Sequence, residues 1–150
     1  MAIEKRYRPI DLLEDVAIGV KLPFVGKGGV LFDLSYSTEE QLLSNLKNLI
    51  LTRKGERVYQ PAFGTNLQDS LFEQNDDIMR RKIENSIKTA IDFWLPYVNI
   101  VELTVNNVIA SSSKIDEHGV VIKLTVQLNG RDAETSLTFL VTPTLITINE

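Results

Sequence analysis

Three carboxylates near the middle of the chain have the residue types that acid–base chemistry needs. A glycosidase places two carboxyl groups on opposite sides of a substrate cleft, and Glu56, Asp69 and Glu73 lie close enough in sequence to be considered. However, 20 acidic residues make such a cluster unremarkable, and Asp69 and Glu73 have the spacing of a solvated helix face. Arg53 and Arg57 can also pair with Glu56. A peptidoglycan hydrolase is therefore kept only as the alternative, and we predict no catalytic residue and no enzyme.

Nucleophilic and metal chemistry have less support. The chain has no cysteine, which excludes disulfides and thiolate ligands, and His118 is its one histidine. His118 lies in a predicted turn without the other ligands that a zinc site requires. The sequence "GKGG" at 26–29 lacks the spacing of a phosphate-binding loop. We therefore predict no metal site and no cofactor.

Two basic clusters raise the question of phosphate binding. They are Arg53, Lys54 and Arg57, and Arg80, Arg81 and Lys82. The first follows the end of a predicted helix, where positive charge offsets the helix dipole, and the second lies on an exposed helix face. With 16 basic residues against 20 acidic ones, the formal charge is −4. We therefore predict neither nucleic-acid nor membrane binding.

Length and composition predict one packed domain. The chain has 150 residues, of which 43% are hydrophobic and 24% charged, as in an average globular protein. The start, "MAIEKRYRPIDLLEDV", lacks the apolar run of a signal peptide, and no run approaches the roughly 18 apolar residues of a membrane span. We expect the chain to stay in the cytoplasm of the cell that makes it.

Two main helices are predicted from apolar residues at three- and four-residue spacing. The first has overlapping capping boxes, Ser37 with Glu40 and Thr38 with Gln41, and runs to about residue 52. The second runs from about 76 to 94 and ends before Pro96. The predicted core residues are Leu42, Leu43, Leu46, Leu49 and Ile50 in the first, and Ile83, Ile87, Ala90, Ile91 and Trp94 in the second.

After Pro96 the apolar period changes to two, which predicts strands at roughly 98–109, 119–129 and 134–142. The alternation is irregular between Ile100 and Val105. Turn signals at 117–119 and 129–130 favour an antiparallel meander. The tail at 143–150 is either an edge strand of this domain or an arm that joins another subunit's sheet.

The fold class is therefore α+β: an antiparallel meander of three or more strands, covered on one face by two main helices, with an N-terminal extended arm. Residues 1–36 form the arm, with a possible strand at 30–36, and residues 37–150 form the domain.

Between the two predicted helices, "LILTRKGERVYQPAFGTNLQDSLFE" at 49–73 has the composition of a rigid corner. Pro61 and Gly64 limit the freedom of the loop, and Thr65 with Gln68 predicts a capping box for a short helix. Arg53 and Arg57 either present forked donors to a partner or brace the fold, with Arg57 pairing to Glu56 or Asp69. Phe63 and Phe72 are expected in the core.

The corner resembles the contractile-tail baseplate wedge family, historically called lysozyme-like, which includes the phage sheath initiator and its type VI secretion relative. The matching positions are Thr52, Arg53, Gly55, Arg57, Pro61, Phe63, Gly64, Leu67, Leu71 and Phe72. The resemblance covers about residues 38–108 and, more loosely, the chain to 142, while the first 36 residues have no counterpart. Members of the family commonly carry Glu-Pro-Arg after the long helix, where this chain has Leu95, Pro96 and Tyr97.

The resemblance implies a structural part of a tail baseplate, assembled in the host cytoplasm, which templates the first sheath ring by strand addition. The implied partners are baseplate wedge and core-bundle proteins, first-ring sheath subunits, and tube or hub proteins. A generic interaction or chaperone module is a further alternative. The predicted partner-binding residues are Arg53, Glu56, Arg57, Pro61, Phe63, Gly64, Trp94, Leu95, Pro96, Tyr97, Leu145, Ile146 and Ile148.

Overall fold

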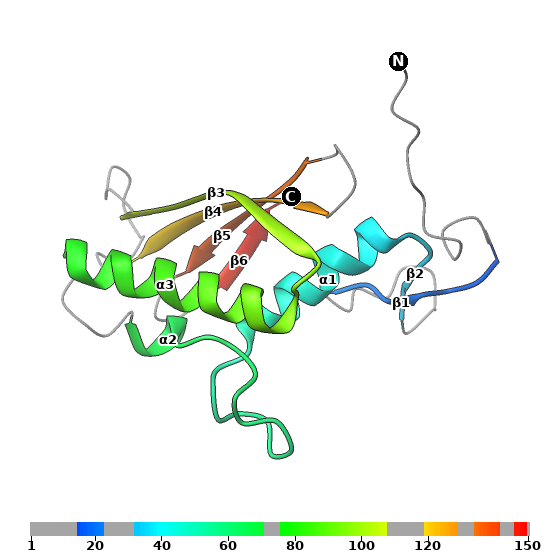
Figure 1. The fold of residues 1–150 in the computed structure, drawn as a ribbon, viewed down its shortest axis with the longest axis horizontal. Coiled ribbons are helices and arrows are strands. Elements are labelled where there is room, and N and C mark those ends of the chain that lie inside the picture. Colours follow the sequence, from blue (N-terminus) through cyan, green and yellow to red (C-terminus); the bar gives the residue numbers. More distant parts are fainter. Residues whose placement is uncertain are drawn as a thin grey trace. The chain divides into compact units, whose positions relative to one another are not determined.

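The computed structural model describes residues 15–22, 32–70, 76–107, 119–128, 134–141 and 146–149. Its elements are β1 (Gly19–Val20), β2 (Leu34–Ser35), α1 (Thr38–Leu51), α2 (Leu67–Ser70), α3 (Asp77–Trp94), β3 (Val98–Asn107), β4 (Val120–Leu128), β5 (Glu134–Val141) and β6 (Ile146–Asn149) (Figure 1). The predicted α+β class is confirmed, with α1 and α3 as the two main helices. No helix in the described part of the chain is long and apolar enough to cross a membrane.

The described residues form two compact units, one reaching up to Leu49 and the other starting at Ile50. The first holds β1, β2 and most of α1, and the second holds the four-stranded sheet, α2 and α3. The division into an arm at 1–36 and a domain at 37–150 stays a prediction. The turn signals at 117–118 and 129–130, His118, Leu71, Phe72 and Glu73 lie outside the described residues.

The sheet of the second unit has the order β3-β4-β5-β6, and each neighbouring pair is antiparallel. The predicted meander is confirmed, and the C-terminal tail supplies its fourth strand. Ile146 pairs with Val141 and Asn149 pairs with Thr138, so β6 is an edge strand of its own domain. The sequence left open whether the tail is an edge strand of its own domain or an arm that joins another subunit's sheet, and the structure shows the edge strand.

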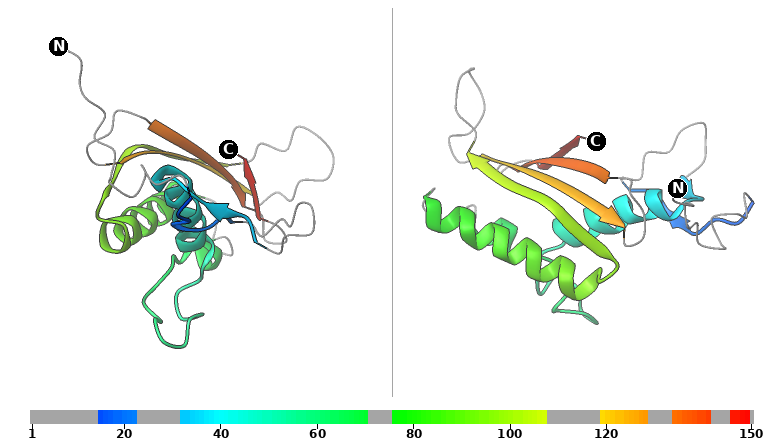
Figure 2. Two further views of the ribbon diagram at one scale, coloured as in Figure 1. Left: turned by 90° about the vertical axis from the view of Figure 1, so that its right-hand side faces the viewer. Right: turned by 45° about the horizontal axis from the view of Figure 1, so that its top comes forward.

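One face of the sheet is the core of the second unit. Alternate residues of β4 are buried from Val120 to Leu128, and Leu137, Phe139 and Val141 are buried in β5. Side chains two residues apart point to the same face of a strand, so these residues form one apolar layer. The helix α3 packs along β3 and covers this side of the sheet (Figures 1 and 2).

A β-bulge explains the irregular alternation in the sequence of β3. The register with β4 shifts between Ile100 and Glu102, which leaves Val101 as the extra residue. Val98 is buried before the bulge and Val105 after it, so buried positions change from even to odd numbers along the strand. A bulge has this effect because one inserted residue reverses the facing of all that follow.

The ends of α3 follow the sequence prediction. The Asp76 carboxylate caps the helix by accepting a hydrogen bond of 2.8 Å from the Met79 N–H, which satisfies one free donor of the first turn. Ile83, Ile87, Ala90 and Ile91 are buried, as predicted. Trp94 is only half-buried, because it lies at the last helical residue and faces the loop that precedes α2.

The helix α1 differs from its predicted pattern in what it buries. Leu42, Leu46, Leu49 and Ile50 are buried as predicted, whereas Leu43 is only half-buried. Ser44 and Lys47 are buried instead, and Lys47 is 4% exposed. The Lys47 Nζ donates to the carbonyl of Leu22 at 3.0 Å, so the N-terminal segment covers this side of the helix and satisfies the buried ammonium group.

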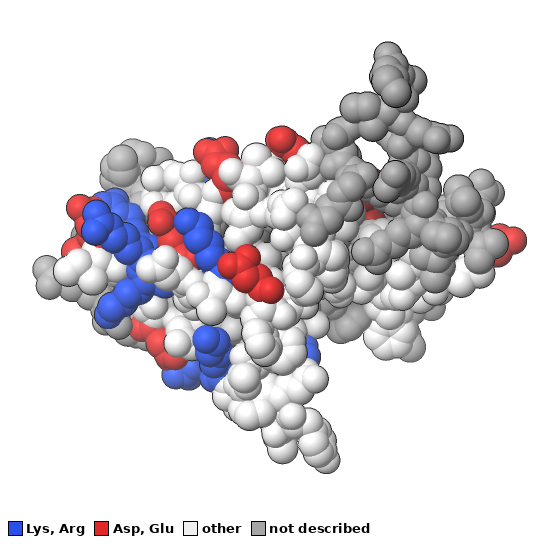
Figure 3. All heavy atoms as spheres, viewed as in Figure 1, with Lys and Arg blue, Asp and Glu red and all other residues white. Residues whose placement is uncertain are grey.

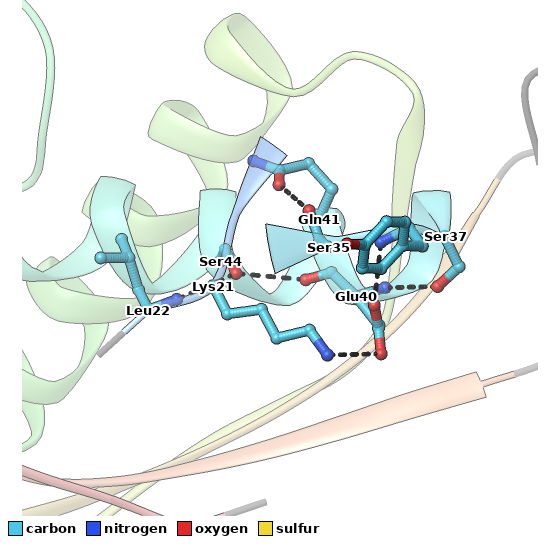
Figure 4. A network of polar contacts seen from close by, with 8 residues as sticks. Lys21, Leu22, Ser35, Ser37, Glu40, Gln41 and Ser44 are labelled. Atoms are coloured by element: carbon cyan, nitrogen blue, oxygen red, sulfur yellow. Dashed lines mark hydrogen bonds and ion pairs between the residues drawn. The ribbon is translucent and has the colours of Figure 1, made fainter. Parts of the chain in front are cut away.

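A polar network fastens β1 and β2 to the start of α1 (Figure 4). The Ser37 hydroxyl caps the helix by accepting from the Glu40 N–H at 3.2 Å, which confirms the predicted start. The Glu40 carboxylate accepts from the Lys21 Nζ at 2.8 Å and from the Tyr36 N–H at 3.2 Å. The Leu22 N–H donates to the Ser44 hydroxyl at 3.2 Å.

These contacts shift two pKa values in opposite directions. The hydrogen bond from Lys21 holds the pKa of Glu40 below its ordinary value of 4.5, with further help from the Tyr36 N–H. The same bond raises the pKa of Lys21 above 10.5. Both charges are therefore present at neutral pH, and the network joins residue 21 to the helix through an ion pair.

Candidate docking site

The corner, defined here as residues 52–66, is closed at its base by backbone hydrogen bonds. The Thr65 N–H donates to the carbonyl of Thr52 at 2.9 Å, and the Lys54 N–H donates to the carbonyl of Thr65 at 3.2 Å. The Thr65 hydroxyl donates to the carbonyl of Ile50 at 2.9 Å. Thr65 therefore fastens the corner to the end of α1, and the predicted capping box with Gln68 is wrong, since α2 begins only at Leu67.

Glycine is required at the base because the two chain segments approach closely. Gly64 has a φ of 109°, in the region that L side chains avoid, and a Cβ at this position would collide with the carbonyl oxygen of Thr52. Gly55 also has a positive φ, 88°, but a Cβ there would meet nothing within 4 Å. Gly64 is therefore required by both its backbone conformation and the lack of space, whereas Gly55 is required by its backbone conformation alone.

The outer part of the corner is held by further turns. The Gly55 N–H donates to the carbonyl of Pro61 at 2.8 Å, which bridges the loop across its width. The Arg53 N–H donates to the Glu56 carboxylate at 2.9 Å, and the Glu56 N–H donates to the carbonyl of Arg53 at 3.1 Å. The backbone geometry of the corner is therefore fixed by its own hydrogen bonds.

The two arginines of the corner have separate roles. Arg53 forms an ion pair with Asp69 of α2, and both side chains are about half exposed. The guanidinium group of Arg57 lies over the ring of Phe63, 3.9 Å from its centroid, in cation–π geometry. Arg53 thus braces the corner through an ion pair, and the pairing of Arg57 with Glu56 or Asp69 stays a prediction.

An aromatic ladder, consisting of Arg57, Phe63, Trp94 and Phe93, joins the corner to the end of α3. The ring centroids of Phe63 and Trp94 are 5.2 Å apart, and those of Trp94 and Phe93 are 5.1 Å apart, both in edge-on geometry. Phe63 is half-buried, so its expected place in the core is only partly correct. Its members come from the corner and from the last two residues of α3.

Three exposed apolar side chains were missed by the sequence analysis: Val58 and Tyr59 in the corner, and Phe93, a member of the ladder. Tyr59 is 98% exposed and Val58 is 89% exposed at the tip of the corner, and Phe93 is 71% exposed at the end of α3. Val58 and Tyr59 could have been recognised in the sequence as an apolar pair between polar loop residues, where no helix or strand period requires apolar side chains. Large apolar side chains held out on a rigid loop are typical of a contact surface.

The predicted docking residues after α3 do not all reach the surface. Leu95 is 7% exposed, so its side chain belongs to the core of the second unit. Pro96 is exposed and Tyr97 is half-buried. The backbone turns sharply here, with the Leu95 N–H donating to the carbonyl of Ile91 at 2.8 Å and the Val98 N–H donating to that of Leu95 at 3.0 Å.

The remaining predicted site residues lie on the other side of the unit. Ile146 and Ile148 are in β6 at the sheet edge, and Leu145 lies outside the described residues. The structure therefore brings together Arg57, Phe63 and Trp94, but places the corner and β6 apart as two separate surfaces. Their roles in binding a partner stay predictions.

Two of the three carboxylates considered for catalysis, Glu56 and Asp69, are engaged within the fold, and Glu73 lies outside the described residues. Asp69 pairs with the Arg53 side chain, and Glu56 accepts from the Arg53 N–H. Over the residues that the structure describes, no three histidine or acidic side chains gather where a metal ion would fit. The polar groups of the corner thus act on one another and on the backbone.

Comparison with known proteins gives the family. The model of the family described as baseplate wedge protein gp25 matches residues 36–144, which is most of the chain and includes the corner, both main helices and the strands β3, β4 and β5. The chain belongs to this family. The resemblance drawn from the corner residues is thereby confirmed.

A baseplate wedge protein gp25 from Enterobacteria phage T4 is a relative in sequence. It is 35% identical over 75 residues, which cover 49% of this chain and 55% of that protein. The matched region therefore spans about half the length of this curated relative.

Two solved structures share the fold of this family member. A candidate tail lysozyme from Geobacter sulfurreducens superimposes with a TM-score of 0.62 at 23% identity, covering 73% of this chain and 94% of that one. A chain of the anti-feeding prophage baseplate superimposes with a TM-score of 0.59 at 21% identity, covering 72% and 82%. At such identities the likeness shows the fold alone.

Proposed function

We propose that this baseplate wedge family member is a structural part of a contractile tail, assembled in the host cytoplasm, which joins wedge proteins and templates the first sheath ring by strand addition. The observation that carries the proposal is the position of β6. Within the described residues β6 pairs with β5 on one side, and its other side is the edge of the sheet. An unpaired edge is a template for an extended segment of another chain.

The two edges of the sheet differ in a way that favours β6 as the template. The opposite edge, β3, carries the bulge at Val101, and a bulge bends a strand and interrupts regular pairing. No register shift interrupts the pairing of β5 with β6 from Val141 to Thr138. A sheath segment would therefore find a regular ladder at β6.

The corner supports a second contact, with a wedge or core-bundle protein. Its hydrogen bonds fix the loop before binding, which reduces the entropy lost when a partner docks. Val58 and Tyr59 present apolar surface at its tip, and Phe93 of the aromatic ladder presents a further exposed ring. Burial of aromatic side chains is the contribution that most often dominates an interface.

A hydrolase is the alternative, and the engagement of Glu56 and Asp69 with Arg53 does not favour it. The word lysozyme in the description of a structural neighbour belongs to that protein, and a shared fold does not supply a catalytic site. Incubation of the purified chain with peptidoglycan should release no soluble sugar. Release that disappears in the Glu56→Gln or Glu73→Gln variant would support the alternative instead.

The proposal is tested by baseplates assembled with a chain that ends at residue 145. This truncation removes β6 and leaves β3, β4 and β5 paired, so the variant should enter baseplates and fail to start a sheath. Sheath of normal length on such baseplates would overturn the template role.

A second pair of variants covers the case in which the truncated chain does not fold. Neighbouring residues of a strand point their N–H groups in opposite directions. One of the two variants Thr147→Pro and Ile148→Pro therefore removes an N–H donor at the outer edge of β6, and the other removes one that faces β5. We expect the variant that lacks the outer-edge donor to fold, to enter baseplates and to block the sheath. Two folded variants that both support normal sheath growth would contradict the proposal.

A further inference from the structure

A polar groove lies between the corner and the middle of α3, apart from the aromatic ladder. Its volume is about 390 Å³, enough for several residues of an extended chain rather than a single ion. The residues that line it are Lys54, Asn66, Asp69 and Ser70 on one side and Lys82, Asn85, Ser86 and Thr89 on the other. All eight residues have polar or charged side chains, which distinguishes the groove from the apolar tip.

The charge of the groove is opposite to that of the whole chain. Lys54 and Lys82 lie on its two sides, and Asp69, the one acidic group among the described residues that line it, is paired with Arg53. Together with Arg53 these groups carry a net positive charge, whereas the whole chain carries −4. Basic side chains lie beside α2 and over the N-terminal half of α3, with acidic side chains between them (Figure 3). The groove therefore favours a negatively charged occupant.

The neutral groups of the groove match a peptide backbone. Asn66 and Asn85 each carry an amide that both donates and accepts, and Ser86 and Thr89 add hydroxyl groups. The two sides are held in place, because the Asn66 N–H donates to the Ser86 hydroxyl at 3.1 Å and the Ser70 hydroxyl donates to the carbonyl of Asn66 at 3.1 Å. Such a fixed set of mixed donors and acceptors suits the alternating N–H and C=O groups of an extended chain.

We propose that this groove binds an acidic, extended segment of a neighbouring baseplate protein, with Lys54 and Lys82 pairing to its carboxylates. This inference rests on the proposed function in one respect, which is that the partner is a baseplate protein. Nucleic acid fits less well, because none of the eight lining residues is aromatic and no base could stack on them. An acidic peptide uses both the charges and the amides.

The test uses the full-length ¹⁵N-labelled chain and two synthetic peptides, one of alternating Glu and Ser and one of alternating Gln and Ser. We expect the Glu peptide to shift the amide resonances of Asn66, Asn85 and Ser86, and the Gln peptide to bind much more weakly. The shifts should decrease with added salt, because exposed ion pairs are screened. Equal binding of both peptides, or shifts confined to other surfaces, would overturn the proposal.

Charge reversals locate the contact. The double variant Lys54→Glu with Lys82→Glu should weaken Glu-peptide binding by about tenfold or more, since it replaces two attractive pairs with repulsive ones. Lys88→Glu, on an exposed position of the same helix outside the groove lining, is the matched control and should change binding little. Equal loss in both variants would show a non-specific charge effect and would contradict the groove as the site.

An oligothymidylate of the same charge as the peptide separates the two classes of anion. Binding of this oligonucleotide as tightly as the Glu peptide would overturn the choice of a protein partner. The peptide measurements test the groove alone, whereas incorporation into baseplates tests the proposed function. A wrong groove assignment can therefore be distinguished from a wrong proposed function.

Discussion

At the scale of single residues, the corner depends on two glycines for different reasons. Gly64 allows the close approach of the chain to the carbonyl of Thr52, and Gly55 only supplies a left-handed turn. A left-handed conformation costs a side chain about 1–2 kcal/mol, and overpacking adds about 1–3 kcal/mol. Position 64 should therefore be the more sensitive of the two.

We predict that Gly55→Ala lowers the free energy of unfolding by about 1–2 kcal/mol, through backbone strain alone. Gly64→Ala should lower it by about 3 kcal/mol or more, because the strain is joined by the collision with Thr52. Urea unfolding of the two variants beside the wild type measures both values. Equal losses would mean that the corner adjusts freely, and would contradict its description as rigid.

The ion pair of Lys21 and Glu40 gives a second prediction at this scale. The folded-state pKa of Glu40 is depressed, so its contribution to stability is present above its ordinary value of 4.5 and is lost as the pH falls through the lower folded value. The pKa of Lys21 is raised, so its contribution is lost only as the pH rises beyond 10.5. The ion pair should therefore contribute to the free energy of unfolding throughout the pH range from 4.5 to 10.5.

We expect Glu40→Gln to be less stable than the wild type at pH 7, with a difference that shrinks as the solution is acidified below pH 4.5. Urea unfolding over a series of pH values gives the difference directly. Lys21→Met and the double variant complete a mutant cycle that isolates the pair from the capping bonds of Glu40. A difference that is unchanged by pH would show that the carboxylate charge contributes nothing.

At the scale of elements, the helices and strands follow the sequence, and the exceptions have local physical causes. The cap at Asp76, the end of α3 before Pro96 and the alternation in β4 are features of short range, so residue patterns predict them. The burial of Lys47 depends on the carbonyl of Leu22, which is distant in sequence. No helical period reveals such a contact, so the sequence did not predict that Lys47 is buried.

The candidate site was predicted in part, for the same reason. Pro61, Gly64 and the arginines identify a rigid corner from their residue types. The pairing of Arg53 with Asp69 could not be predicted, because several charged residues are near one another in sequence and the folded loop selects this pair. The exposure of Val58 and Tyr59 likewise follows from the path of the loop.

We predict that the double variant Val58→Ser with Tyr59→Ser keeps its stability within about 0.5 kcal/mol, since both side chains are exposed. Its incorporation into baseplates, measured by quantitative immunoblot of purified particles, should fall sharply because the apolar contact is lost. Ile78→Ser, which removes an exposed apolar side chain at the start of α3, is the matched control. Normal incorporation of the tip variant would show that the corner is not a docking element.

At the scale of the whole molecule, the account assigns separate tasks to separate surfaces of the second unit. The edge of β6 would receive a sheath segment, the corner tip would dock on a wedge or core-bundle protein, and the groove beside α3 would hold an acidic segment. The family match over residues 36–144 covers the corner and the groove and ends before β6, which begins at Ile146. Such an arrangement would let one small protein connect several partners.

The most direct test of the central claim is cryo-electron microscopy of the assembled tail from which this chain comes. The account predicts this chain between the wedge and the first sheath ring, with an extended segment of a sheath subunit paired to β6 and the tip of the corner buried against a wedge protein. A chain absent from the particle, or present with β6 unpaired beside an assembled sheath, would contradict it.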